Sequence, residues 1–158
     1  MTFKSKAAIC GLGITDQGKV FGKTAPQFGI EAVALALQDA GLDKSDLDGM
    51  LIYTGNATSG SSSFDQSVIL PNFMGLRNMR LFSYVDTMGA TAGAMLQYAS
   101  LAVAAGMANY VACVFADGVA RSTASQQDAL HGAMHILDRL PHPHRLQASH
   151  GIAQHSRA

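Results

Sequence analysis

The feature that most constrains the fold of this 158-residue chain is a regular alternation of short apolar runs with segments of helical period. Apolar runs occupy residues 7–14, 50–53 and 110–115, and residues 80–85 alternate as another strand would. Strands joined by crossovers of ten or more residues pair in parallel, and the connecting helices then cover the sheet. The alternation therefore predicts an α/β fold class, in which a layered, mostly parallel sheet is covered by helices.

Local signals mark the ends of two helices. Thr24 is a favourable capping residue, Pro26 suits a first helical turn, and Gly41 is a common left-handed residue after a last turn. A second helix is predicted over 89–106, which is rich in alanine and glycine. Because a helix without a polar face is normally buried on all sides, we expect this one to lie centrally in the layers.

Composition excludes several classes of function. Lys+Arg and Asp+Glu both number 11, and no basic block is present, which argues against nucleic-acid binding. The longest apolar region, 90–114, is interrupted by Gln97 and Asn109, so we expect no membrane span. Cys10 and Cys113 both sit in apolar runs, as buried, reduced thiols of a cytoplasmic protein would.

Two glycine-containing stretches resemble nucleotide-binding loops but lack essential residues. Gly11-Leu12-Gly13 has Asp16 where a dinucleotide-binding loop needs its third glycine, so a tight turn after the first strand is predicted instead. Residues 56–63 are expected to be a loop, and the part at 59–63 lacks the Gly-Lys-Ser/Thr ending of a phosphate-binding loop. The following segment, 64–74, is expected to be partly helical.

A histidine pair raises the question of a metal site. His131 and His135 lie four residues apart on a predicted helix, with Asp138 on the same face. Gly132 stands where a zinc protease carries its glutamate, so that chemistry is absent. A solvated polar face explains the same spacing, and no metal ligand is assigned.

Four stretches together resemble the thiolase family, especially the thiolase-like proteins described as acetyl-CoA acetyltransferases or non-specific lipid-transfer proteins. They are Ala8-Ile9-Cys10-Gly11-Leu12-Gly13-Ile14-Thr15, the helix from Ile30 to Leu42, Gly55-Asn56, and Ala104 to Val111. The resemblance spans residues 7–118. It implies a thiolase-like N-terminal domain over 1–120, a partial loop-region helix over 121–140 and a disordered tail over 141–158.

The resemblance also implies where catalysis would occur. The family carries a nucleophilic cysteine at the N-terminus of its central helix, where the helix dipole lowers the thiol pKa. In this chain that position holds Gly89, and a slip of one residue gives Met88 or Ala90. We therefore assign no catalytic residue and no permanently bound cofactor. Met88, Gly89 and Thr91 are the expected substrate pocket, with a coenzyme A thioester as the expected substrate.

Three hypotheses follow. The first is a thiolase-like acyltransferase of acyl-CoA and lipid metabolism whose isolated chain is inactive, because the nucleophile and the C-terminal half of the family are missing. The second is a non-catalytic subunit of a heteromeric complex, paired with a thiolase-like chain or a zinc-ribbon/OB-fold protein. The third is a truncated or frame-shifted product. We also expect a homo-oligomer formed through the strand at 80–85, which has no charge after Arg80.

Overall fold

The computed structural model describes residues 6–18, 20–54 and 70–117. Its elements are α1 (Ala25–Ala40), η1 (Lys44–Asp46), β1 (Gly49–Tyr53), β2 (Leu81–Tyr84), η2 (Met88–Ala90), α3 (Thr91–Ala104) and β3 (Val111–Phe115). Residues 70–73 are also helical. The loop expected at 56–63, the start of the segment 64–74, and the helix and tail expected over 121–158 lie outside the described residues.

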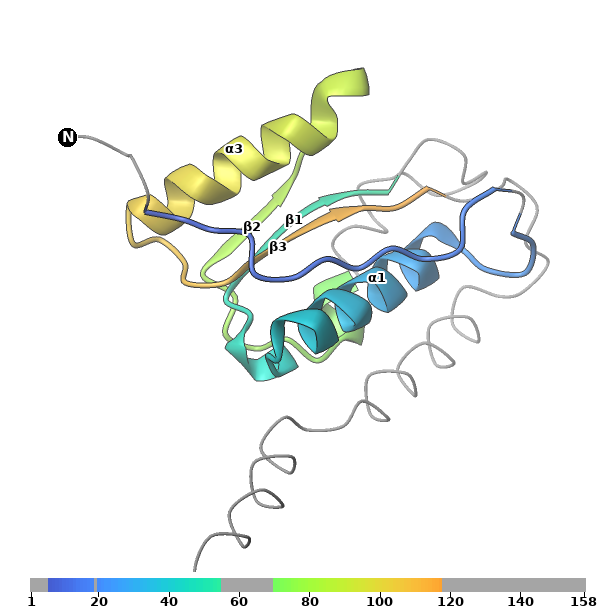
Figure 1. Ribbon diagram of the computed structural model, residues 1–158, viewed down its shortest axis with the longest axis horizontal. Helices are drawn as coiled ribbons and strands as arrows, with labels where there is room; N and C mark the ends of the chain where they lie inside the picture. The colour runs from blue at the N-terminus through green and yellow to red at the C-terminus, as the bar shows by residue number, and fades with distance from the viewer. Residues whose placement is uncertain (1–5, 19, 55–69, 118–158) are drawn as a thin grey trace, which may run out of the picture.

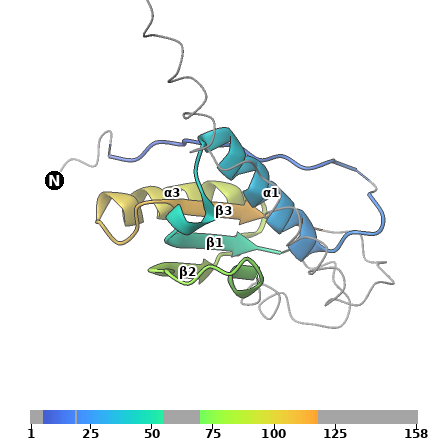
Figure 2. The same ribbon diagram turned by 90° about the horizontal axis from the view of Figure 1, so that it is seen from below.

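The three strands form one parallel sheet in the order β2-β1-β3 (Figure 2). Gly49 at the start of β1 pairs in register with Leu81 on one side and with Val111 on the other. Helix α1 covers one face of the sheet and α3 covers the other (Figure 1). The predicted α/β class with a parallel sheet between helices is confirmed.

The central strand divides the core into two apolar clusters, because successive side chains of a strand point to opposite faces. Met50 and Ile52 belong to the cluster on the α1 side, and Leu51 belongs to the cluster on the α3 side. All three side chains are fully buried. This double burial explains why the run at 50–53 is continuously apolar and does not alternate with polar residues.

Helix α1 begins and ends where the sequence indicates. The Thr24 backbone N–H donates a 2.7 Å hydrogen bond to Gln27 Oε1, which satisfies one of the donors left free at a helix start. At the other end, Gly41 has φ 67° and its N–H bonds to the Gln38 carbonyl, as in a left-handed C-terminal cap.

The N-terminal segment 7–14 departs from the predicted buried strand. It is extended but belongs to no strand, and its side chains Ile9, Leu12 and Ile14 are exposed by 76%, 66% and 64%. Figure 1 and Figure 2 both show it running beside α1, on the β3 side of the sheet. Cys10 in this segment is exposed, contrary to expectation, and Cys113 is half-buried.

The two glycines of this segment let its backbone lie directly against α1. A Cβ added at Gly13 would stand 1.9 Å from the Ala32 carbonyl oxygen, and one at Gly11 would stand 2.3 Å from the Ala36 carbonyl oxygen. The Leu12 N–H also donates a 2.9 Å hydrogen bond to Asp39 Oδ2 on the same helix. The motif is therefore a contact surface for a helix, and the predicted tight turn is wrong.

We expect Gly13→Ala to lower the free energy of unfolding by about 1–3 kcal/mol, because the added methyl group meets backbone that cannot rotate away. Chemical denaturation followed by circular dichroism measures the effect. Gly93→Ala is the matched control, since a Cβ at Gly93 meets nothing within 4 Å and alanine favours helix. Equal stability of Gly13→Ala and wild type would show that the segment does not pack on α1 in solution.

Helix α3 is less enclosed than expected. Met95 and Ala102 pack on the sheet, whereas Leu96, Tyr98 and Leu101 are exposed by 47%, 55% and 44%. The expectation that the helix is buried on all sides is therefore wrong for this chain, and one apolar side of it is open. Strand β2 forms an edge of the described sheet, where the sequence placed self-association. That association itself stays a prediction.

Candidate functional site

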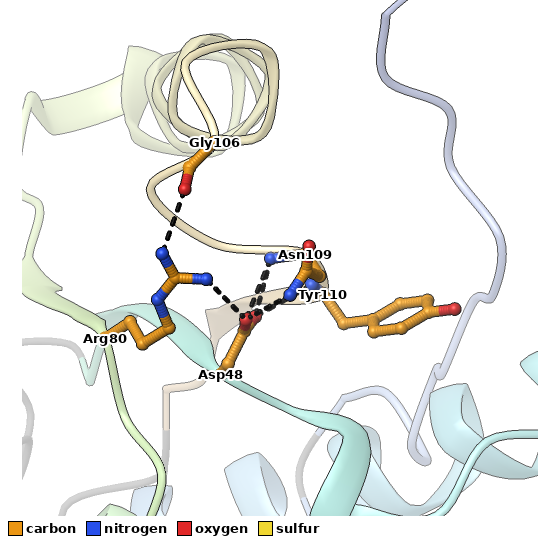
Figure 3. A network of polar contacts seen from close by, with 5 residues as sticks. All are labelled: Asp48, Arg80, Gly106, Asn109 and Tyr110. Atoms are coloured by element: carbon orange, nitrogen blue, oxygen red, sulfur yellow. Dashed lines mark hydrogen bonds and ion pairs between the residues drawn. The ribbon is translucent and has the colours of Figure 1, made fainter.

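The amino ends of the three strands are joined through one carboxylate, Asp48, which is 7% exposed (Figure 3). Its oxygens accept hydrogen bonds from the Asn109 backbone N–H at 2.8 Å, the Asn109 side-chain amide at 2.9 Å and the Tyr110 N–H at 2.9 Å. Asp48 precedes β1, and both partners precede β3. A charged acceptor that receives several N–H bonds is among the stronger polar contacts in proteins.

The third strand joins the same network through Arg80, which precedes β2. Its backbone N–H donates to the Asp48 carbonyl at 2.7 Å, and its guanidinium lies 3.8 Å from Asp48 Oδ2. The guanidinium also donates a 3.0 Å bond to the Gly106 carbonyl after α3. The Asp48 carboxylate and the Arg80 guanidinium are thus engaged in contacts that hold the strands and α3 together, so we do not place the functional site at this end.

We expect Asp48→Asn to lower the free energy of unfolding by about 2 kcal/mol. The substitution removes the negative charge that accepts several hydrogen bonds, and it places the new amide N–H group against the N–H groups of Asn109 and Tyr110. Urea denaturation measures the loss. The control is Asp16→Asn, at an exposed position outside any element, which should change stability by less than about 0.5 kcal/mol. An unchanged midpoint for Asp48→Asn would contradict the role given to this carboxylate.

The carboxyl ends of the strands carry a row of aromatic rings. Tyr53 ends β1, and its ring stacks on Phe115 of β3 with centroids 4.8 Å apart and an interplanar angle of 27°. The Tyr84 ring of β2 lies 6.0 Å from that of Tyr53, but Tyr84 packs with the cluster on the α1 side of the sheet and Tyr53 with the cluster on the α3 side. In open α/β sheets, ligands bind outside the carboxyl ends of the strands. This row is therefore the candidate functional site.

Electrostatics keep the Tyr53 phenol protonated. Desolvation raises the pKa of Tyr53 above its ordinary value, and the charges of Asp86 and Asp117, together with Tyr84, raise it further. Asp86 and Asp117 are exposed and lie two residues beyond the ends of β2 and β3. The site thus offers aromatic surface, a hydroxyl that acts as a hydrogen-bond donor at neutral pH, and nearby negative charge.

The pocket residues predicted from the sequence lie in the turn that follows β2. Met88 has φ 56°, unusual for a residue with a side chain, and its side chain is 82% exposed. Thr91 holds this turn: its buried hydroxyl accepts from the Thr87 N–H at 2.9 Å and donates to the Met88 carbonyl at 2.8 Å. A Cβ at Gly89 would meet nothing within 4 Å. A substrate pocket at Met88, Gly89 and Thr91 stays a prediction.

The sequence did not point to the aromatic row, because its members lie 31 residues or more apart and meet only when the sheet forms. Apolar strand ends are ordinary and carry no motif. The described residues contain no group of three or more His, Cys, Asp or Glu placed to hold a metal ion. His131, His135 and Asp138 lie outside the described ranges. Within those ranges, no helix is both long and apolar enough to cross a membrane.

Tyr53 should also influence stability at alkaline pH. Because the pKa of Tyr53 is raised in the folded state, folding favours the protonated phenol. This contribution is complete below the unfolded tyrosine pKa of about 10 and is lost as pH rises through the folded value. We expect the free energy of unfolding to fall more steeply above about pH 10 in wild type than in Tyr53→Phe. Denaturation at a series of pH values, with Tyr98→Phe as control, tests this. Identical slopes in wild type and Tyr53→Phe would contradict it.

Comparison with known proteins gives relatives of one kind. No protein-family model matches the chain. It is 36% identical over 107 residues to a steroid side-chain-cleaving aldolase of Thermomonospora curvata, covering 68% of this chain and 26% of that protein. It is 34% identical over 106 residues to a 17-hydroxy-3-oxo-4-pregnene-20-carboxyl-CoA lyase of Mycobacterium tuberculosis, covering 67% of this chain and 26% of that protein.

A solved structure gives the same result. The Ltp2-ChsH2(DUF35) aldolase matches with a TM-score of 0.55 and 36% identity, over 67% of this chain and 26% of that one. The chain therefore spans about a quarter of the length of each of these relatives.

These names correct the family and the activity expected from the sequence. The relatives are an aldolase and a lyase, and the solved structure carries the label DUF35; none is named as a thiolase or an acyltransferase. The identification as a thiolase-like acetyl-CoA acetyltransferase of lipid metabolism is therefore wrong. Short stretches such as the one ending at Gly41-Leu42 misled us, because they reflect how a helix ends and packs and do not specify a reaction.

Proposed function

We propose that this chain forms one lobe of an enzyme that cleaves a carbon–carbon bond in the side chain of a steroid coenzyme A thioester. The observation that carries the proposal is the 36% identity to the side-chain-cleaving aldolase, which extends over 107 residues, or 68% of this chain. The lyase and the solved aldolase match over the same share of the chain. Three relatives with one kind of chemistry support this class of reaction over acyl transfer.

The chemistry follows from the substrate named for the lyase, which has a hydroxyl on the carbon β to the thioester carbonyl. In a retro-aldol cleavage, a base takes the hydroxyl proton and the carbon–oxygen double bond forms as the bond between the α and β carbons breaks. The thioester accepts that electron pair as an enolate, which is then protonated on carbon. Such a reaction needs an apolar site for the steroid, a base, and donors for the enolate oxygen.

In this proposal the lobe contributes binding surface and acts within a larger assembly. Aromatic rings and a protonated phenol stand at the carboxyl ends of its strands. The open apolar side of α3, with Leu96 and Leu101, supports a covering polypeptide, since monomers rarely leave such patches bare. The name of the solved aldolase joins two components, which supports a heteromeric complex. A zinc-ribbon/OB-fold partner would be one form of it.

Equilibrium dialysis against two thioesters tests the proposed function. We expect the purified chain to bind 17-hydroxy-3-oxo-4-pregnene-20-carboxyl-CoA saturably, and at least about tenfold more tightly than acetoacetyl-CoA. Chromatography of the same samples should show both thioesters intact, because these 158 residues span about a quarter of the length of the relatives that carry out the reaction. The proposal would be contradicted if the chain bound the two thioesters equally well or did not bind the steroid thioester.

A further inference from the structure

We propose that the stacked rings of Tyr53 and Phe115 form a platform that binds the flat, uncharged ring system of the steroid, away from the coenzyme A end. This inference rests on the proposed function and adds the part of the substrate that this chain contacts. Tyr53 ends β1 and Phe115 ends β3, the two strands that pair at the centre and one edge of the described sheet.

The geometry of the pair suits a flat ligand. The rings are 4.8 Å apart and nearly parallel, so each covers one face of the other. Phe115 remains 53% exposed and Tyr53 is half-buried. Tyr84 packs with the cluster on the other face of the sheet, so the platform consists of the Tyr53 and Phe115 rings alone. These two rings are held by paired strands in direct register, and a surface organised before binding lowers the entropic cost of binding a rigid polycyclic ligand.

The negative charge beside the platform favours the uncharged end of the substrate over the coenzyme A end. Asp86 and Asp117 are exposed and lie two residues beyond the last residues of β2 and β3, at the same end of the sheet as the rings, and their negative charge also raises the pKa of Tyr53. Coenzyme A carries negatively charged phosphate groups, which these carboxylates repel, whereas the fused hydrocarbon rings carry no charge and are not repelled. The electrostatic arrangement thus directs the phosphates away from the platform and leaves it to the uncharged part of the molecule.

The same carboxylates raise the alternative of a cationic ligand held over the rings. Cation recognition uses aromatic faces that converge on the charge. Here Tyr53 and Phe115 use their facing surfaces on each other, which leaves an outer face and edges and no box around a cation. We therefore commit to the neutral ring system, and a cation becomes an outcome of the test.

The test uses progesterone, an uncharged steroid without coenzyme A, as the probe. The full chain contains no tryptophan and four tyrosines, so binding is followed by tyrosine fluorescence and by equilibrium dialysis. We expect saturable binding by wild type and about tenfold weaker binding by Phe115→Ala, since this change removes the more exposed ring of the stacked pair. Tyr53→Phe should retain dialysis binding to within about threefold while losing most of the fluorescence change.

The control is Tyr110→Ala, which removes an aromatic side chain that is 41% exposed at the opposite end of β3. Figure 3 shows this ring pointing away from Asp48. Tyr110→Ala should bind progesterone as wild type does. Circular dichroism establishes that each variant is folded. If Phe115→Ala prevents folding, Phe115→Leu, which keeps the apolar volume but not the ring, should still weaken binding.

The outcomes separate this inference from the proposed function. Progesterone binding that is unchanged in Phe115→Ala, or equally reduced in Tyr110→Ala, would overturn the platform while the binding of the steroid thioester still supports the lyase proposal. Tighter binding of tetramethylammonium than of progesterone would replace the platform with a cation site. Failure of wild type to bind progesterone, when it binds the thioester, would also overturn the platform. Failure to bind either ligand would count against the proposed function itself.

Discussion

The fold depends on a single buried carboxylate. Asp48 accepts backbone and side-chain N–H bonds from Asn109 and Tyr110 and lies beside Arg80, so the residues that precede all three strands meet at one group. Parallel strands cannot be joined by tight turns, and their starting points must be fixed by contacts between residues far apart in the chain. With the amino ends fixed in this way, the register of the sheet brings the last residues of β1 and β3, Tyr53 and Phe115, opposite each other.

The alternation of apolar runs and helical segments was sufficient to predict the layers and the parallel sheet, and Thr24 and Gly41 were sufficient to predict the ends of α1. It could not predict the N-terminal segment, because Gly11 and Gly13 match a turn equally well. Only the position of α1 in the structure shows that glycine is needed here because carbonyl oxygens of α1 lie where a Cβ atom would be. Nor could it identify Asp48, whose partner Asn109 lies 61 residues away. Periodicity reports which face a residue occupies, whereas such contacts depend on how the elements are assembled.

The candidate site was hidden for the same reason. The resemblance to the thiolase family led to Met88, Gly89 and Thr91 beside the start of α3, and the structure shows the Thr91 hydroxyl bonded within that turn. Tyr53 and Phe115 form no motif and become a surface only when β1 and β3 pair. The names of the relatives then replaced acyl transfer with carbon–carbon bond cleavage as the proposed reaction. Retro-aldol cleavage needs a base and no cysteine nucleophile, so glycine at position 89 is compatible with it.

We propose that the carboxyl ends of the strands receive a steroid thioester while the amino ends hold the fold. Hydrogen exchange measured by mass spectrometry, with and without the thioester of the lyase, distinguishes the two ends of the sheet. We expect bound ligand to slow exchange in peptides covering 50–54 and 111–117 and to leave α1 (25–40) unchanged. Protection confined to α1 or to the residues around Asp48, or no change anywhere at saturating ligand, would contradict it.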